Sequence, residues 1–114
     1  MVELREVLAF DPRIRYCAVL DAMGRTIEGG MRPGLLSLEP DEEADKVDLQ
    51  MVLIRGITEG ARGYLGGVNY VIIHREKLML IAIPASNGRT ILVSAEPDFP
   101  LERARAFFEL VKLL

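Results

Sequence analysis

Cysteine and histidine are nearly missing from this sequence, which contains one of each among its 114 residues. A tetrahedral zinc site, an iron–sulfur cluster and an internal disulfide each need more of these side chains than the chain holds. Most metal and redox chemistry is therefore excluded for the chain on its own. No residue pattern forms a catalytic signature either. We expect no catalytic residues, no cofactor and no metal, and a function that lies in the surfaces of a non-catalytic protein.

A basic excess and a long apolar run are also missing. The formal net charge is −3, whereas duplex nucleic-acid binding normally needs a positive surface. The longest apolar run, Leu78 to Ile83, is far shorter than the ~18–20 residues that cross a bilayer. Residues 1–6 are mixed in charge and do not resemble a secretion signal. We expect no nucleic-acid partner, no membrane span and a cytoplasmic location, which suits an unpaired Cys17.

The composition that is present is that of one globular domain. Half of the residues are hydrophobic and 27% are charged, and there is no internal repeat or linker, so residues 1–114 are expected to form a single domain. Charge is uneven, because residues 39–48 hold six acids and one lysine, a net of −5, and the remainder sums to +2. Eleven of the 14 basic residues are arginine, which favours fixed contacts but is also explained by habitat or coding bias.

Five strands are predicted from runs of β-forming residues bounded by turn sequences. The first, over 14–21, has two apolar faces, with Ile14, Tyr16, Ala18 and Leu20 on one and Cys17 and Val19 on the other. A turn over 21–24 joins it to the second strand, over 25–31, in a β-hairpin. Three further strands are expected over 68–74, 78–83 and 90–95.

Three helices complete the prediction. The first, over 2–9, is short and amphipathic and ends before Asp11-Pro12. The second begins after Pro40, with acids in its first turn. The last starts near Asp98, a candidate cap, and repeats apolar residues at helical spacing: Leu101, Ala104, Phe107, Phe108, Val111 and Leu114. The order α-β-β-α-β-β-β-α predicts an α+β, sandwich-like fold: a five-stranded antiparallel sheet with flanking helices.

The second helix carries more apolar surface than one neighbour can cover. At 100° per residue its apolar side chains span about 200°, against roughly 100° for a helix with one buried face. They are Val47, Leu49, Met51, Leu53, Ile54 and Ile57. The narrow polar side holds Asp48, Arg55 and Glu59. We expect two burial partners for this helix and interpret Asp48 as part of a partner-facing surface.

Several motifs have a structural interpretation that we favour over a chemical one. Gly60 to Gly66 matches G-x-x-G-x-x-G, but it follows a helix and opens a strand, the reverse of a phosphate-binding loop, and is interpreted as a helix cap and turn. His74 is interpreted as a strand-end histidine, Cys17 as a small buried hydrophobe and the acids of 39–48 as a solvated helix start.

Four arginines cluster on the first hairpin and its flanks: Arg13, Arg15, Arg25 and Arg32. They are either solvent-facing side chains of the strands or a recognition face for an acidic surface, a carboxylate or a phosphate.

The order of elements resembles the roadblock domain, within the profilin-like and longin-like group. The resemblance rests on the first hairpin with glycine at its turn (residues 20–27), the long two-sided helix and the terminal helix. More narrowly, segments 11–15, 27–34, 37–38, 69–72 and 93–97 are similar to an uncharacterised family of small archaeal proteins. That second family brings no established activity.

The roadblock resemblance implies a homodimer in which the long helices pack together and the third strands pair into one sheet. Such dimers are platforms for small Ras-like GTPases or for larger assemblies, so the implied partners are a second copy and a small GTPase or another protein. The expected dimer residues are Leu49, Leu53, Ile57, Val68, Asn69 and Tyr70. The expected partner contacts are Arg13, Arg15, Arg25 and Arg32.

Two other functions fit the same elements. A PAS-like small-ligand sensor predicts a lined internal pocket and a melting temperature that rises with a metabolite. A metal-dependent enzyme at the acidic helix start predicts magnesium or manganese binding that is lost when Asp41 and Asp45 become Asn.

Overall fold

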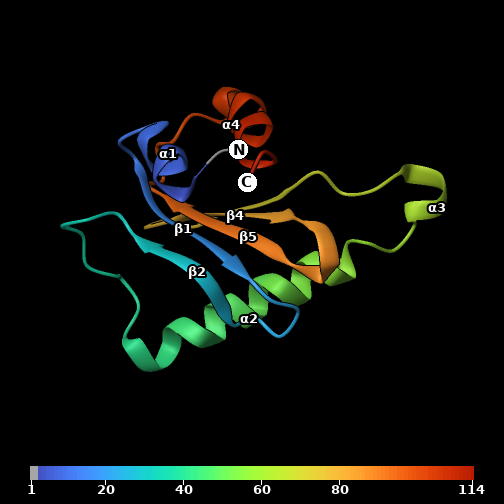
Figure 1. Ribbon diagram of the computed structural model, residues 1–114, viewed down its shortest axis with the longest axis horizontal. Helices are drawn as coiled ribbons and strands as arrows, with labels where there is room; N and C mark the ends of the chain where they lie inside the picture. The colour runs from blue at the N-terminus through green and yellow to red at the C-terminus, as the bar shows by residue number, and fades with distance from the viewer. Residues whose placement is uncertain (1–2) are drawn as a thin grey trace.

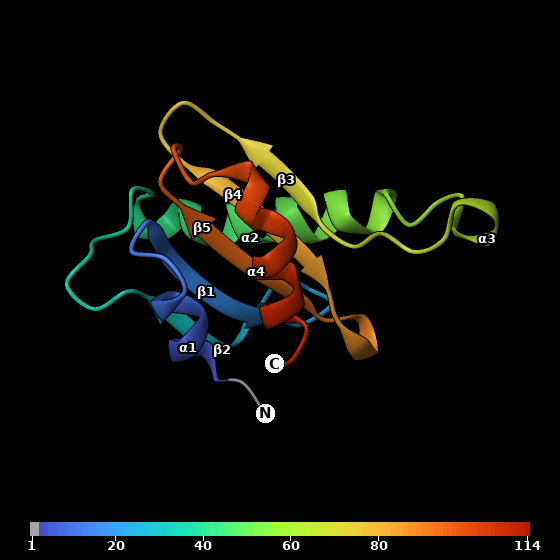
Figure 2. The same cartoon turned by 90° about the horizontal axis from the view of Figure 1, so that it is seen from above.

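The computed structural model describes residues 3–114, without the side chains of Asp41 and Glu42. These residues form a five-stranded antiparallel sheet with helices on both faces (Figures 1 and 2). The elements are α1 (Leu4–Ala9), β1 (Ile14–Leu20), β2 (Thr26–Met31), α2 (Asp41–Ile57), α3 (Arg62–Leu65), β3 (Val71–His74), β4 (Met79–Pro84), β5 (Thr90–Ala95) and α4 (Ala104–Val111). The predicted fold class is confirmed, and α3 is an addition to the predicted order.

The sheet has the spatial order β2-β1-β5-β4-β3, with every neighbouring pair antiparallel. The two hairpins are joined through β5, which lies in the centre between β1 and β4. Central strands are covered on both faces, which explains why β4 and β5 are almost continuously apolar and buried. The edges are β2 on one side and β3 on the other.

Two hydrophobic layers hold the helices to the sheet. On one face α1 and α4 lie side by side (Figure 1), and Val7, Phe107 and Val111 pack with Cys17 and Val93. On the other face α2 runs beneath the sheet, and its buried Met51 packs with a second set of strand residues. That set is Ala18, Leu20, Leu78, Leu80, Ala82 and Leu92.

One predicted strand face is wrong at Ile14. The sequence placed Ile14 with Tyr16, Ala18 and Leu20, but Ile14 packs in the α1/α4 layer with Cys17. The register of β1 on β5 shifts between Ile14 and Tyr16, which marks a β-bulge or irregularity. An extra residue at such a point reverses the alternation of the side chains, so the period of two does not carry through.

The β1–β2 turn closes against α2. The Asp21 carboxylate accepts hydrogen bonds from the backbone N–H groups of Met23 (2.9 Å) and Arg25 (3.0 Å), as expected for a turn begun by aspartate. Gly24 has φ of +83°, and a Cβ there would lie 3.1 Å from Leu49 Cα. Glycine is therefore required both for the turn and for the close approach of the helix.

Several predicted boundaries shift. The first helix begins at Leu4 rather than residue 2, which lies outside the described residues. The helix α2 ends at Ile57 with Thr58 at its C-cap, so Gly60 is not the cap. The strand β3 begins at Val71 rather than Val68. Across residues 3–114, no helix is long and apolar enough to cross a membrane.

Asp98 does not cap the last helix. A 3-10 turn over Leu101–Arg103 precedes α4 with Pro100 at its N-cap, and no side-chain hydrogen bond is made there. The backbone carbonyl of Asp98 instead accepts a hydrogen bond from the Arg13 guanidinium. The apolar spacing of this helix is nevertheless confirmed, since Ala104, Phe107 and Val111 are buried.

Candidate interaction surfaces

The outer face of α2 is apolar and uncovered. Leu49 is 41% exposed, Leu53 56% and Ile57 79%, whereas Met51 on the sheet side is 2% exposed. Leu49, Leu53 and Ile57 lie four residues apart and form one stripe along the helix. We call these three residues the α2 stripe. A surface of this kind is where a second burial partner of α2 would pack.

The polar side of α2 faces the sheet, not a partner. Asp48 and Arg55 are half-buried, and Asp48 lines a hollow between α2 and the sheet together with Tyr16 and Leu92. Burial raises the pKa of Asp48 to about 6, with Asp45 and Glu39 adding like charge. The interpretation of Asp48 as partner-facing is therefore wrong, because the helix is rotated so that Asp48 lies on the sheet side, where Val47, Met51, Val52 and Ile54 pack with the strands.

The edge strand β3 is short and apolar. Val71, Ile72 and Ile73 are half-buried, and over the described residues β3 pairs with β4 alone. Tyr70, expected in the dimer interface, packs on the α4 layer with its ring centroid 5.6 Å from that of Phe108. Val68 and Asn69 precede the strand. The structure therefore offers Val71–His74, rather than Val68 to Tyr70, as the open strand edge.

The C-terminal part of the α2 stripe lies on the flank of α2 that is nearer to β3. One flank of α2 touches the β1–β2 turn at Leu49, and the other flank lines a groove with the β3–β4 turn through Gln50. At 100° per residue, Ile57 lies about 20° and Leu53 about 60° around the helix from Gln50, whereas Leu49 lies about 100° away. Leu53 and Ile57 thus belong to the flank near β3, and Leu49 lies nearest the β1–β2 turn.

Two hollows lie along α2. The larger, about 780 Å³, opens between the N-terminal half of α2 and the β3–β4 turn. We call it the groove; it is lined by Leu38, Glu39, Val47, Gln50, His74, Arg75, Glu76, Lys77, Leu78 and Leu80. The smaller, about 170 Å³, is the one beside Asp48. Its volume is below the roughly 300–1,000 Å³ of ordinary ligand sites.

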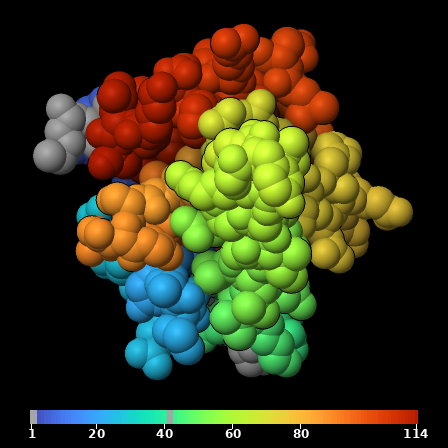
Figure 3. Space-filling view, turned by 90° about the vertical axis from the view of Figure 1, so that its right-hand side faces the viewer, coloured from blue at the N-terminus to red at the C-terminus, as the bar shows by residue number. Residues whose placement is uncertain are grey.

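Residues 58–69, between α2 and the packed side chain of Tyr70, extend beyond the sheet as an arm (Figures 1 and 2). Figure 3 views the molecule from this end, where the green and yellow-green surface of α2 and the arm stands in front of the sheet. At its tip, α3 leaves Tyr64 86% and Leu65 80% exposed. The glycine-rich segment is therefore a projecting element rather than a simple helix cap and turn.

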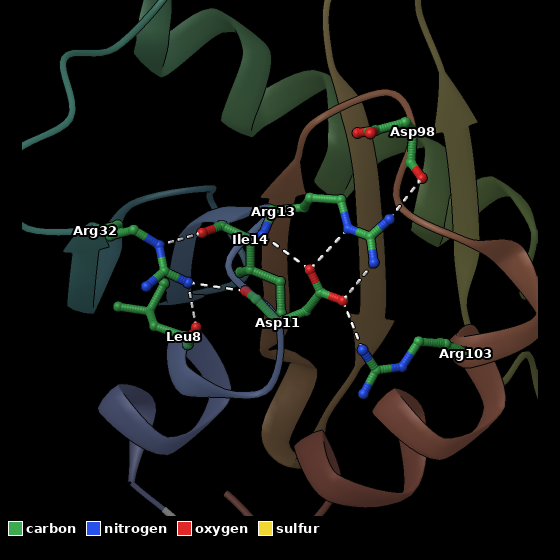
Figure 4. Close-up of polar contacts among 7 residues, drawn as sticks. All are labelled: Leu8, Asp11, Arg13, Ile14, Arg32, Asp98 and Arg103. Atoms are coloured by element: carbon green, nitrogen blue, oxygen red, sulfur yellow. Dashed lines mark hydrogen bonds and ion pairs between the residues drawn. The ribbon is translucent and has the colours of Figure 1, made fainter.

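Two of the four predicted contact arginines build one internal cluster (Figure 4). Asp11 is 1% exposed, and its carboxylate accepts from Arg13 Nε (2.9 Å) and Nη2 (3.0 Å) and from Arg103 Nη1 (2.6 Å). Arg32 donates to the backbone carbonyls of Leu8, Ile14 and Asp11. These contacts join α1, β1, β2 and the start of α4.

The hydrogen bond from Arg13 is the largest cause that lowers the pKa of Asp11 to about 2. Burial acts in the opposite direction, and the Arg13 and Arg103 charges add to the lowering. A bidentate guanidinium holds a carboxylate charged in this way even where water is excluded. Asp11 is a structural anion, held by residues from two ends of the chain.

The other two predicted contact arginines differ in exposure. The Arg15 side chain is 11% exposed and bonds to Glu96 (2.7 Å) and to the carbonyl of Leu36. Arg25 is exposed beside the β1–β2 turn. Three of the four arginines thus have internal partners, which accounts for much of the arginine content of this hairpin. Their contact with another protein stays a prediction.

Cys17 and His74 lie where the sequence predicts them. Cys17 is fully buried, and burial raises its thiol pKa to about 12, so the predicted buried hydrophobe is confirmed. His74 ends β3 as predicted, and its Nε2–H donates to the Pro97 carbonyl at 2.8 Å. In the part of the chain whose side chains are described, no three His, Cys, Asp or Glu residues gather as metal ligands. The Asp41 carboxylate of the metal hypothesis lies outside that part.

Comparison with known proteins relates this arrangement to solved roadblock structures. The Roadblock/LC7 domain from Streptomyces avermitilis is 16% identical, with a TM-score of 0.70 over 96% of this chain and 86% of that chain. The gliding protein MglB from Thermus thermophilus is 16% identical, with a TM-score of 0.72 over 93% and 77%. An MglB with a tetrameric arrangement is 16% identical, with a TM-score of 0.73 over 93% and 76%.

The chain therefore has the roadblock/LC7 fold, and the predicted roadblock resemblance is confirmed at the level of fold. No known protein-family model and no curated protein sequence matches the chain. The resemblance to small archaeal proteins stays a prediction.

Sequence reasoning missed the arm tip and the groove. The only signal for the arm was the glycine-rich segment, in which Tyr64 and Leu65 are the large apolar residues. The groove combines residues from α2, the preceding loop and the β3–β4 turn, so no single segment of sequence carries it.

Proposed function

We propose that this protein is a non-catalytic interaction module that acts as a homodimer. The observation that carries the proposal is the α2 stripe, whose three apolar side chains are 41–79% exposed although the opposite side of the helix is buried in the core. A second copy related by a two-fold axis covers such a stripe with its own stripe, because a two-fold interface uses the same surface on both partners.

The β3 edge supports the same arrangement. Its half-buried apolar residues and free backbone groups lie on the Gln50 flank of α2, so one partner can cover both features. Antiparallel pairing of two β3 strands would extend the sheet across both copies and remove an edge open to aggregation. The expected dimer residues are then Leu53, Ile57 and Val71–His74, with Leu49 at the margin.

The partner of the dimer is proposed on the fold resemblance. Roadblock-like dimers serve as platforms for small Ras-like GTPases or for larger assemblies, and a scaffold or regulator of a small GTPase is the role we assign here. Assemblies of the same fold support oligomerisation, since one similar MglB forms a tetrameric arrangement. Of the four arginines predicted to contact a partner, Arg25 is exposed, whereas the other three make the internal contacts described above.

A charge placed in the stripe tests the dimer. Leu53→Glu buries a carboxylate against the second copy, and we expect it to raise the dimer dissociation constant at least 100-fold, measured by sedimentation equilibrium. Leu113→Glu is the matched control, because Leu113 is 55% and Leu53 56% exposed, and Leu113 follows α4 on the opposite face of the sheet. Equal dissociation constants for the two variants would place the interface elsewhere.

A further inference from the structure

Two surface features of the chain are complementary but lie at opposite ends of it. The arm precedes β3 and follows α2, whereas the groove follows β3 and lies on the N-terminal half of α2. The 17 residues of α2 span about 25 Å. No residue of the arm lines the groove of its own copy, and the arm projects away from the N-terminal half of α2 (Figure 1).

We propose that the arm of each copy packs into the groove of the other copy, with Tyr64 and Leu65 as its anchors. This inference rests on the proposed dimer, and it adds a contact that neither the α2 stripe nor the β3 edge supplies. In an antiparallel pair, the residues before a strand in one copy lie alongside those after the same strand in the other. Pairing of two β3 strands thus directs each arm toward the second copy's His74 and β3–β4 turn.

The dimensions of the arm suit this contact. β3 has four residues, about 13 Å, and the five residues from Gly66 to Tyr70 reach at most about 17 Å. The tip at α3 can therefore pass the end of the second copy's β3 and lie over the groove. The two-fold axis produces the contact twice.

The arm is built to hold its tip in place. The N–H groups of Leu65 and Gly66 donate to the carbonyls of Ala61 (2.9 Å) and Arg62 (3.0 Å), closing α3. The Arg62 side chain bonds to Glu59 at 3.0 Å and covers Gly67, where a Cβ would lie 2.8 Å from Nη1. The Arg62 side chain thus holds the segment before α3 close to the segment after it, while the side chains of Tyr64 and Leu65 stay exposed.

The groove suits an aromatic and an aliphatic side chain. Leu78 and Leu80, 9% and 5% exposed, contribute an apolar lining, and Val47 adds to it from α2. Its rim carries charged and polar groups, including Glu39 and Lys77, that can hydrogen-bond a tyrosine hydroxyl. Its volume of about 780 Å³ accommodates two side chains of this size.

Cross-linking between differently tagged copies tests the contact. Copies carrying Leu65→Cys are equilibrated with copies carrying Lys77→Cys and treated with a short bismaleimide. We expect a covalent heterodimer within minutes. Leu65→Cys mixed with Ala22→Cys, placed in the exposed β1–β2 turn, serves as the control and should link at least tenfold more slowly. Native Cys17 is fully buried and does not compete.

A second measurement separates this inference from the proposed dimer. Sedimentation equilibrium of the same unlinked proteins reports whether they dimerise. If the protein is a dimer but Leu65→Cys links to Lys77→Cys as slowly as to Ala22→Cys, the arm contact is wrong and the proposed dimer stands. If the protein is a monomer, both the arm contact and the dimer are wrong. Tyr64→Ala with Leu65→Ala should weaken the dimer at least tenfold, while Leu36→Ala, at an equally exposed leucine outside both surfaces (87%), should leave it unchanged.

Discussion

The Asp11 carboxylate accepts a 2.6 Å hydrogen bond from Arg103 Nη1, although the two residues stand 92 positions apart in the chain. Asp11 follows α1, and Arg103 immediately precedes α4. The Arg103 guanidinium also lies 4.3 Å from the centroid of the Phe10 ring. This contact ties the two helices on one face of the sheet to each other, and with Arg13 it also ties both to β1.

Asp11→Asn should lower the free energy of unfolding by about 2–3 kcal/mol, because it removes the charge of a buried carboxylate that accepts two hydrogen bonds from the Arg13 guanidinium, while keeping its shape. Urea denaturation followed by circular dichroism measures this change. Asp98→Asn is the control, since Asp98 is exposed and the hydrogen bond that it makes in the cluster comes from its backbone carbonyl, which the substitution keeps. A loss below about 0.5 kcal/mol for Asp11→Asn would show that the cluster is not a stabilising one.

The same cluster predicts how stability falls in acid. The Arg13 hydrogen bond lowers the pKa of Asp11 from 3.8 to about 2 in the folded state. A lowered carboxyl pKa stabilises the fold above the unfolded value, and the stabilisation is lost as pH falls from about 4 to 2. Wild type should lose about 2 kcal/mol more than Asp11→Asn over that interval. Parallel acid curves for the two proteins would contradict this.

Asp48 should act in the opposite direction. Burial raises its pKa from 3.8 to about 6, so the charged carboxylate opposes folding above pH 6 and the cost disappears as pH falls toward 4. Asp48→Asn should therefore stabilise the protein by about 1–2 kcal/mol at pH 7 and not at all at pH 4. Denaturation at both pH values measures the difference. A variant that is less stable at pH 7 would show that the charge is needed.

Gly29 tests the register of the edge strand β2. Its φ is +108°, and a Cβ there would lie 2.3 Å from the Cys17 carbonyl oxygen. Gly29→Ala should cost more than about 3 kcal/mol, because both the backbone conformation and the contact forbid a side chain. Gly30→Ala is the matched control, with no atom within 4 Å of its Cβ position, and should change stability by less than about 1 kcal/mol. Equal effects would place β2 in another register.

The regular elements were predictable because each leaves a local pattern. The apolar runs of β4 and β5 and the 3.6-residue spacing of α4 depend on neighbours in sequence. Ile14 was assigned to the wrong face because a local irregularity in β1 leaves no mark on the alternation. Val68 and Tyr70 have strong β propensity, but a strand also needs a partner, and within the described chain these residues precede the paired part.

The candidate surfaces were only partly predictable. The α2 stripe followed from the width of the apolar side of the helix, which exceeds what one sheet can cover. The rotation of α2 did not, because it is set by contacts far apart in the chain, such as Gly24 against Leu49. The arginines were grouped correctly along the first hairpin, but their internal partners, among them Asp11 and Glu96, are recognisable only in three dimensions.

The central claim is that two copies of the chain pair through α2 and β3, and the mass of the unmodified protein tests it most directly. Sedimentation equilibrium at micromolar concentration should give about 25 kDa, twice the 12.7 kDa of one chain. A stable mass of 12.7 kDa across that concentration range would contradict the account.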